Sequence, residues 1–323
     1  MLHANIPSRN PTRLSKRNIS GVLLLDKPYG ISSNKAVQIA KRVFSAAKCG
    51  HTGTLDPMAT GLLPLCLGEA TKFSSVLLGA DKTYETTLKL GFLSTTGDAE
   101  GEIIQLATNI APTLSHCEQV LNRFTGRIRQ VPPMYSALKY QGKPLYVYAR
   151  NGKAVERPAR EVFIDEIQIN SLIENELKLT IRCGTGTYIR TLAEDIGKAL
   201  GCGGAYLTQL RRTAIDCFDL PQSQTLLALE AIDATDRDEY LLPIDCLLQK
   251  FPAVILDEPA ALHILQGRIV HSSSDTRSIA EGHTVRLYDR QQQFLGLGEI
   301  TAEQRIAAKR LLASSYLLGT LHN

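Results

Sequence analysis

One carboxylate in this chain, Asp56, lies in a stretch whose composition suits chemistry on a ligand. Residues 50–64 read Gly-His-Thr-Gly-Thr-Leu-Asp-Pro-Met-Ala-Thr-Gly-Leu-Leu-Pro. Loops on a rigid scaffold often carry catalytic groups, and glycines let the backbone approach a ligand closely. Pro57 favours an extended backbone at Asp56, so this side chain need not cap a helix. The same residues are also ordinary turn formers, so the local pattern alone leaves a surface turn and a catalytic loop both open.

Six other short motifs accompany this loop. They are Gly-Val-Leu-Leu-Leu-Asp-Lys-Pro at 21–28, Gly-Glu-Ala-Thr-Lys-Phe at 68–73, Asp-Lys-Thr-Tyr at 81–84, Met-Tyr-Ser-Ala-Leu-Lys-Tyr-Gln-Gly-Lys at 134–143, Gly-Thr-Tyr-Ile-Arg-Thr-Leu at 186–192 and Leu-Arg-Arg-Thr at 210–213. Several matches in one order are far more specific than a single short pattern. In order and approximate spacing, these motifs resemble those of the bacterial TruB family of tRNA pseudouridine synthases. The resemblance covers residues 21–213 and fades after about residue 220.

The resemblance implies three catalytic residues. Asp56 would be the nucleophile, and Arg190 would be the cation that pairs with it and favours its charged form. Tyr84 would stack on the target uracil and could take the proton from its C5 atom. Without the resemblance, a core tyrosine and a solvated or carboxylate-paired arginine would be the commoner interpretations of Tyr84 and Arg190.

The resemblance also implies a set of substrate-binding residues. His51 would enter the T-loop of tRNA and help to hold the target nucleotide out of its stack, which costs a few kcal/mol. Lys27 and Leu210 would form walls of the pocket, although a surface lysine and a core leucine are nearly as good interpretations. The other residues expected to bind substrate are Lys139, Lys143 and Tyr188.

The reaction that the resemblance implies needs no imported group. Pseudouridine forms when the bond from uracil N1 to ribose C1′ breaks and a bond from C5 to C1′ replaces it, with no change in redox state. We therefore expect no cofactor and no metal. The sequence agrees in that it contains no P-loop and no His-Glu-x-x-His motif, and the glycines at 201–204 lack the third glycine of a dinucleotide fingerprint. Whether Asp56 attacks C1′ or elimination comes first stays open.

Composition indicates an ordinary globular protein. The chain has 323 residues, of which 44% are hydrophobic and 21% charged, and no apolar run has the length of a membrane span. The seven cysteines are odd in number and lack metal-ligand spacing, so we expect reduced thiols and a cytoplasmic protein. Residues 1–20 contain four basic residues, no acid and no apolar core, which is not the pattern of a secretory signal. An Arg- and Ser-bearing transit peptide is the alternative to the disordered basic tail that we expect here.

Positive charge is concentrated in residues 122–160. This segment holds nine Lys or Arg residues and one acid, Glu156, whereas the net charge of the whole chain is only +4. Four tyrosines are interleaved with these cations, at 135, 140, 146 and 148. Cations can neutralise phosphates while aromatic faces stack on unpaired bases, so the pattern favours RNA over a merely solvated face.

Periodicity predicts strands and helices that do not strictly alternate. Strands are expected at 21–25, 62–67 and 84–90, with two more in 162–182 joined by a turn at Glu174-Asn175. Helices are expected after a cap at Ser32 or Ser33, at 69–78, along the face formed by positions 114, 117, 121 and 124, and at 188–200. Residues 221–250 are leucine-rich and acidic, which suggests a helical connector.

The last part of the chain suggests a small β domain. Strands are expected at 254–256, 284–288 and 294–300, and the position and size of this region resemble the C-terminal PUA-type module of the family. The expected fold class is α+β, a pseudouridine synthase fold with a mixed, mostly antiparallel sheet plus this β-rich domain. The expected domains are a tail at 1–20, a catalytic domain at 21–250 and an RNA-binding domain at 251–323.

These observations predict a tRNA pseudouridine synthase that acts on the T-loop uridine at position 55. The expected partner is the T-arm of tRNA, with no membrane, no obligatory protein partner and a monomeric chain. Two alternatives remain open. The chain could be the catalytic subunit of a guide-RNA-dependent pseudouridylase, or a tRNA-binding folding factor whose chemistry is secondary.

Overall fold

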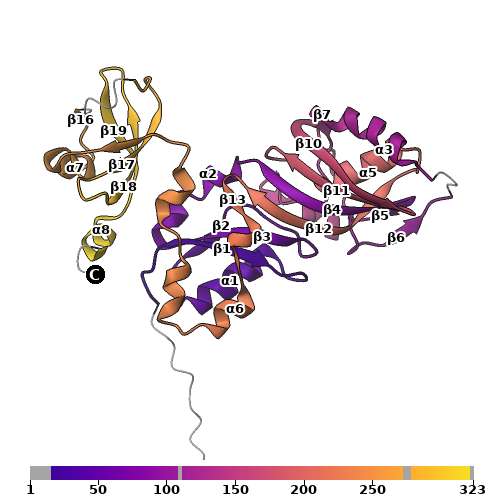
Figure 1. Ribbon diagram of the computed structural model, residues 1–323, viewed down its shortest axis with the longest axis horizontal. Coiled ribbons are helices and arrows are strands. Elements are labelled where there is room, and N and C mark those ends of the chain that lie inside the picture. The colour runs from indigo at the N-terminus through magenta and orange to yellow at the C-terminus, as the bar shows by residue number, and fades with distance from the viewer. Residues whose placement is uncertain (1–15, 108–110, 272–277, 321–323) are drawn as a thin grey trace, which may run out of the picture.

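The computed structural model describes residues 16–107, 111–271 and 278–320. Two sheets dominate it: the C-terminal sheet lies at one end of an elongated molecule, and the larger sheet extends from the middle to the other end (Figure 1). The larger sheet has ten strands in the described part of the chain, and the smaller C-terminal sheet has five. Helices cover the larger sheet without alternating regularly with its strands, so the predicted α+β class is confirmed.

The ten-stranded sheet is mixed and mostly antiparallel, as predicted. Its main path runs β14-β1-β3-β12-β4-β11-β10-β7, and only β1–β14 and β3–β12 are parallel pairs. The strands of this sheet are β1 (Gly21–Lys27), β2 (Cys49–His51), β3 (Thr60–Leu67), β4 (Lys82–Leu90), β7 (Gly126–Gln130), β10 (Arg160–Ile173), β11 (Glu176–Cys183), β12 (Ala205–Ile215), β13 (Phe218–Asp219) and β14 (Gln224–Thr225). The turn between β10 and β11 falls at Glu174, which has a φ of 53°.

Two of these strands, β1 and β3, are buried on both faces. Along β1, Leu23 and Leu25 belong to one hydrophobic core, while Val22 and Leu24 belong to a second. A strand that is covered on both sides has no polar face, which explains the continuous leucine-rich runs in the sequence. Strand β4 buries the face that carries Tyr84, Thr86, Leu88 and Leu90, and Thr87 on its other face is also buried.

The first core lies under helices that were largely predicted. These helices are α1 (Ser33–Val43), α3 (Leu114–Leu121), α5 (Ile189–Ala199) and α6 (Leu226–Ala231). Ser32 caps α1 by accepting a hydrogen bond from the amide of Lys35. The prediction for α3 was wrong at one position, because Leu114 is exposed and the buried residues are Cys117, Val120 and Leu121.

The second core continues from the ten-stranded sheet into the C-terminal sheet. On the side of the ten-stranded sheet, it includes η1 (Gly68–Lys72), α2 (Ser75–Leu78) and η5 (Ile244–Leu248). The single helix predicted at 69–78 is therefore two short helical segments. Three further 3₁₀ segments lie before residue 250 in the described part of the chain: η2 (Asn122–Phe124), η3 (Leu220–Gln222) and η4 (Asp236–Tyr240).

The C-terminal sheet has the order β15-β17-β18-β19-β16. Its elements are β15 (Ala253–Ile255), α7 (Glu258–Leu265), β16 (Val270–His271), β17 (Thr284–Tyr288), β18 (Phe294–Ile300), β19 (Arg305–Leu311) and α8 (Ser314–Thr320). The three predicted strands are present, while β16, β19 and both helices were not predicted. A small β-rich C-terminal unit is confirmed.

Specific contacts join the two units. Glu69 accepts a hydrogen bond from the backbone amide of Ala313 at 2.6 Å, and the Tyr288 hydroxyl donates to Asp245 at 2.6 Å. The rings of Phe73 and Phe294 meet edge to face, with their centroids 5.8 Å apart. These contacts and the shared core fix the C-terminal sheet against the ten-stranded sheet.

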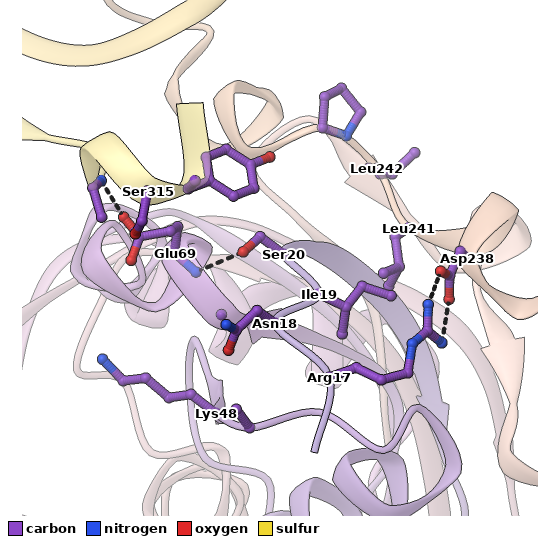
Figure 2. Close-up of a pocket in the computed structure, with 15 residues that line it drawn as sticks. Arg17, Asn18, Ile19, Ser20, Lys48, Glu69, Asp238, Leu241, Leu242 and Ser315 are labelled. Atoms are coloured by element: carbon purple, nitrogen blue, oxygen red, sulfur yellow. Dashed lines mark hydrogen bonds and ion pairs between the residues drawn. The ribbon is translucent and has the colours of Figure 1, made fainter. Parts of the chain in front are cut away.

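A hollow of about 900 Å³ lies at this junction (Figure 2). Arg17 pairs with Asp238 on one side of it, and Ser20 accepts from the amide of Glu69 on the other. Of the predicted tail, residues 1–15 lie outside the described residues. For residues 17–20 the prediction of disorder is wrong, because their contacts with Asp238 and Glu69 and the Arg17–Ala46 bridge hold them against the rest of the chain.

Candidate active site

A pocket of about 620 Å³ opens beside Asp56. Its walls come from the 54–56 loop, β4, residues 136–138, the segment that enters α5, and β12, so distant parts of the sequence converge there. Of the nine residues predicted for the site, those that line the pocket are Asp56, Tyr84, Tyr188, Arg190 and Leu210.

Asp56 and Arg190 form an ion pair. The guanidinium Nη2 of Arg190 lies 3.0 Å from Oδ2 of Asp56. Backbone carbonyls hold the guanidinium in place, since Nη1 donates to Thr96 at 2.9 Å and Nη2 to Tyr135 at 2.7 Å. The Arg190 side chain is only 6% exposed, whereas that of Asp56 is 35% exposed because it faces the pocket. The carboxylate is therefore accessible, and the cation behind it is fixed.

Asp98 is a member of this network that the sequence did not reveal. It is buried, and its Oδ2 lies 3.8 Å from Nε of Arg190. Its Oδ1 accepts from the Thr96 hydroxyl at 2.5 Å and from the amide of Glu100 at 3.1 Å. Gly97 lets this turn pass close to the arginine, because it has a φ of +78° and an added Cβ would lie 3.2 Å from the Cβ of Arg190.

The charge state of Asp56 depends on opposing influences. Burial raises the pKa of its carboxyl group, the Arg190 cation lowers it, and the negative charge of Asp98 raises it again. The balance leaves this pKa above the ordinary aspartate value. A carboxylate whose pKa is raised is a stronger base and nucleophile once ionised, and it is ionised only when the pH lies above that pKa.

Tyr84 and Leu210 form an apolar wall of the same pocket. Both side chains are largely buried, and they come from the neighbouring strands β4 and β12. Burial raises the pKa of the Tyr84 phenol. An aromatic ring and a leucine at this position can cover the face of a planar base, and the ring edge carries one polar oxygen.

Tyr188 lies at the entrance to α5 and is held by its backbone. The side chain of Gln130 is buried. Its Oε1 accepts a hydrogen bond from the backbone amide of Tyr188 at 3.1 Å, and its Nε2 donates to the backbone carbonyl of Tyr188 at 3.3 Å. The guanidinium of Arg160 lies 4.9 Å from the centroid of the Tyr188 ring and also donates to the carbonyl of Gly186. Arg160 lines the pocket as well, although no role was predicted for it.

Two predicted residues lie near the pocket without lining it. Lys27 is fully buried behind the loop, where its Nζ donates to the carbonyls of Pro28 at 2.9 Å and Ile31 at 2.8 Å. Burial lowers the pKa of Lys27 to about 8, against the opposing effect of Asp56. Lys27 is thus not among the residues that line the pocket in this structure, and its role in forming a pocket wall stays a prediction. His51 is half-buried in β2, and its Nδ1 accepts from the amide of Gly53 at 3.3 Å.

The remaining two predicted residues, Lys139 and Lys143, lie on an exposed hairpin. Strands β8 (Lys139–Tyr140) and β9 (Lys143–Pro144) form this hairpin, and helix α4 (Leu145–Arg150) follows it. The rings of Tyr140 and Tyr148 meet edge to face at 5.7 Å, which joins the hairpin to the helix. Both lysines are exposed and neither forms an ion pair within the described ranges, so their charges are available to a ligand. A second small hairpin, β5 (Phe92–Ser94) with β6 (Ile103–Gln105), flanks the Asp98 turn.

The loop that carries Asp56 is fixed to α1 by a buried serine. The Ser33 hydroxyl accepts from the amide of Leu55 at 2.7 Å and donates to its carbonyl at 2.8 Å. Within the described residues, no cluster of three or more His, Cys, Asp or Glu side chains is placed to hold a metal ion. No helix of that part of the chain is long and apolar enough to cross a membrane.

Comparison with known proteins assigns the chain to a family. Residues 41–189 match the TruB family pseudouridylate synthase N-terminal domain, residues 190–249 the tRNA pseudouridylate synthase B C-terminal domain, and residues 252–312 the pseudouridine synthase II TruB C-terminal domain. The tRNA pseudouridine synthase B of Nitrosospira multiformis is 58% identical over 92% of this chain and 97% of its own length. That of Nitrosomonas europaea is 51% identical over 90% of this chain and 95% of its own.

Solved structures agree on the fold. A chain from the crystal structure of a Cbf5-Nop10-Gar1 complex superposes with a TM-score of 0.68 and 25% identity, over 90% of this chain and 84% of that one. The identities above, together with the matches that run through both sheets, lead to one conclusion: the chain belongs to the TruB family of pseudouridylate synthases.

Proposed function

We propose that this protein converts the T-loop uridine at position 55 of tRNA into pseudouridine, with Asp56 as the nucleophile. The observation that carries the proposal is the pocket of about 620 Å³ in which the accessible carboxylate of Asp56 lies 3.0 Å from a buried arginine. Membership of the family and relatives named tRNA pseudouridine synthase B support the tRNA substrate. The isomerase activity follows from the same membership.

Each part of the pocket has a task in this reaction. Asp56 attacks the nucleotide as the N1–C1′ bond breaks, and the electron pair of that bond leaves with the uracil. Arg190 favours the ionised form of Asp56. Tyr84 and Leu210 enclose the detached uracil so that it can turn and present C5. The bond from C5 to C1′ then forms as Asp56 is released from the nucleotide as a carboxylate. The C5 proton leaves to a base, for which the Tyr84 oxygen is the candidate within the pocket, and N1 takes up a proton, so the product is an isomer of the substrate.

The substrate must present its uridine outside the base stack. Flipping a base costs a few kcal/mol, so contacts with the surrounding RNA have to compensate. We assign this role to His51 beside the loop and to the exposed cations of the β8–β9 hairpin, Lys139 and Lys143. Residues 21–250 would form the catalytic domain, and residues 251–323 an RNA-binding domain. The tRNA substrate also suggests that the protein works in the cytoplasm.

The test uses purified protein and one unmodified tRNA transcript that carries tritium at C5 of uridine. Formation of pseudouridine releases this tritium to water, and mapping of the product locates the modified position. We expect one pseudouridine, at position 55, with no added RNA or protein. A transcript in which cytidine replaces this uridine should release no tritium. Release from other positions, or no release at all, would contradict the proposal.

The same experiment separates the two alternatives. The similar solved chain comes from a complex with other proteins, so a requirement for additional subunits or a guide RNA is the alternative that this likeness favours. Activity of the protein alone excludes it. A folding-factor role would show itself if an Asp56→Asn variant, which lacks the nucleophile, still refolded misfolded tRNA as well as the wild type does.

A further inference from the structure

We propose that Arg212 is a positioning residue that ties both ends of the Asp56 loop to Tyr84. The proposal rests on the proposed function, because it assigns Arg212 a task in the reaction of Asp56 and Tyr84 with uracil. Arg212 lies on β12, two residues after Leu210 of the pocket wall, and does not itself line the pocket.

The burial of Arg212 is the first observation. Arg212 is 1% exposed, and its side chain is among the largest fully buried ones of the described residues. It forms no ion pair with any carboxylate in that part of the chain. A buried cation without an anionic partner is costly unless hydrogen bonds satisfy it, so its retention calls for a reason.

The hydrogen bonds of Arg212 supply that reason. Its Nε donates to the carbonyl of Leu62 at 2.6 Å, and its Nη2 donates to the carbonyl of Gly53 at 3.4 Å. Gly53 precedes Asp56 by three residues and Leu62 follows it by six, so one guanidinium holds the two ends of the loop. The planar fork of arginine suits such a task, because its donors point in fixed directions.

The backbone of Arg212 is also fitted to the loop. Arg212 is the parallel partner of Gly61, where β3 begins to leave the loop. An added Cβ at Gly61 would lie 2.2 Å from the carbonyl oxygen of Arg212, and Gly61 has a φ of +100°. Only glycine allows this approach, so the sequence permits Arg212 to lie directly against the end of the loop.

The third contact of Arg212 is with Tyr84. The two residues are paired in register on β12 and β4. Burial raises the pKa of the Tyr84 phenol, and the neighbouring Arg212 opposes this through its charge and a hydrogen bond, while Cys183 and Asp56 raise the pKa further. The charge of Arg212 also lowers the pKa of Lys82, His51 and Lys27, in each case after the larger effect of burial. Arg212 is thus joined to the Asp56 loop and to Tyr84, and its charge also acts on the titratable groups around them.

The test compares Arg212→Met with Arg211→Met. Methionine fills a similar volume without leaving a buried charge unpaired. Arg211 is the matched control, because it is adjacent on the same strand yet pairs with Asp26 at 2.7 Å. We expect Arg212→Met to bind tRNA within about 3-fold of the wild-type affinity and to lose at least about 30-fold in single-turnover rate at saturating tRNA, a loss in the range of misplaced catalytic groups. Arg211→Met should keep the wild-type rate.

A double-mutant cycle with Tyr84→Phe tests whether the effect passes through the tyrosine. The loss caused by Arg212→Met should be smaller in the Tyr84→Phe background than in the wild type, because coupled residues are not additive. Arg212→Lys keeps the charge without the fork, so it should recover only part of the rate, and it carries the test should Arg212→Met not fold.

Three outcomes would overturn the proposal: a wild-type rate in Arg212→Met or Arg212→Lys, equal losses in Arg211→Met and Arg212→Met, or complete additivity with Tyr84→Phe. These outcomes require an active wild-type protein. If the wild type formed no pseudouridine in tRNA, the proposed function would be contradicted instead, so the two failures are distinguishable.

Discussion

The cations of this protein fall into two groups that differ in their surroundings. In and behind the pocket, Arg190 and Arg212 are buried, and backbone carbonyls fix each guanidinium. In the segment 139–153, the four Lys and Arg residues are exposed, and none forms an ion pair in the part of the chain that the structure describes. Buried cations act at short range in a low dielectric, whereas exposed ones act on a ligand through a screened field.

This difference divides the proposed function into two tasks. In the proposed function, the buried arginines would set the charge state and geometry of Asp56 and Tyr84, and so the rate of the chemical step. The exposed cations would attract and orient the RNA backbone, and so set the affinity. Substitutions in the two groups should therefore change different measurable quantities, and the predictions below are ordered by the size of that change.

The largest effect is expected for Asp56→Asn. Asparagine is nearly isosteric but is neither anionic nor nucleophilic, so the single-turnover rate should fall by at least about 10⁴-fold. The dissociation constant for tRNA should change little, because the shape of the pocket remains. Rapid mixing for the rate and filter binding for the affinity would check this. A rate near that of the wild type would show that Asp56 is not the nucleophile.

Arg190→Ala should have the next largest effect. The single-turnover rate at neutral pH should fall by about 10²- to 10³-fold, as for other lost electrostatic partners. Arg190 lowers the pKa of Asp56, so its removal raises this pKa further, and the acid limb of the rate profile should move to higher pH. Part of the rate should return as the pH rises.

The Arg190→Lys variant and the affinity for tRNA serve as controls for the Arg190 prediction. Arg190→Lys should restore only part of the rate, because a point charge cannot make the bonds to Thr96 and Tyr135 that the fork makes. The affinity for tRNA should change less than the rate in both variants. A rate profile in Arg190→Ala that is superimposable on that of the wild type would remove Arg190 from its assigned role.

Replacing Lys139, Lys143, Arg150 and Lys153 together with glutamine should weaken affinity and leave the chemistry intact. Each lost phosphate contact should reduce the slope of log affinity against log salt by about 0.7 to 0.9, so four contacts would reduce it by about three. Equilibrium binding at several salt concentrations measures this slope.

A charge-matched control for that variant carries four substitutions on other surfaces. Lys35, Arg42, Lys198 and Lys250 are exposed and lie outside the basic segment. Their replacement with glutamine removes the same net charge and should leave the slope nearly unchanged. Equal slopes in the two variants would mean that only net charge matters and that the hairpin has no special role.

The smallest effect is expected for an exposed ion pair on the sheet. Arg127 and Glu161 lie 2.9 Å apart with side chains 77% and 60% exposed. Solvent screens such a pair, so Arg127→Gln should change the free energy of unfolding by no more than about 0.5 kcal/mol. Chemical denaturation would measure this. A loss of several kcal/mol would show that exposed charges also support the fold, which would weaken the division between the two groups.

Much of the fold was accessible from the sequence because local rules and burial agreed there. The strand at 21–25, a helix cap at Ser32 or Ser33 and the turn at Glu174-Asn175 were each predicted from local rules, and each was found, with Ser32 as the cap. Predictions were less accurate where tertiary contacts decide. Leu114 fits an apolar helix face by spacing but is exposed, since α3 meets the sheet with Cys117, Val120 and Leu121 instead.

The site was predictable where a residue belongs to a motif and not where a contact depends on the fold. Asp98 precedes Arg190 by 92 residues in the sequence, and only the tertiary fold brings its turn against the arginine. Nothing in the neighbouring sequence distinguishes Asp98 from other aspartates in turns. Arg211 and Arg212 look alike in sequence, yet strand alternation turns one to Asp26 and the other to the Asp56 loop. Which of the two faces inward follows only from the register of β12.

The most direct test of the division between the two groups compares rates at saturating tRNA. Single-turnover rates would be measured for the wild type, Asp56→Asn and the quadruple glutamine variant of the basic segment over a range of protein concentrations. The quadruple variant should reach the wild-type rate once its tRNA is fully bound, whereas Asp56→Asn should stay inactive at every concentration. A quadruple variant that remains slow when saturated would contradict the account, because the exposed cations would then take part in the chemical step itself.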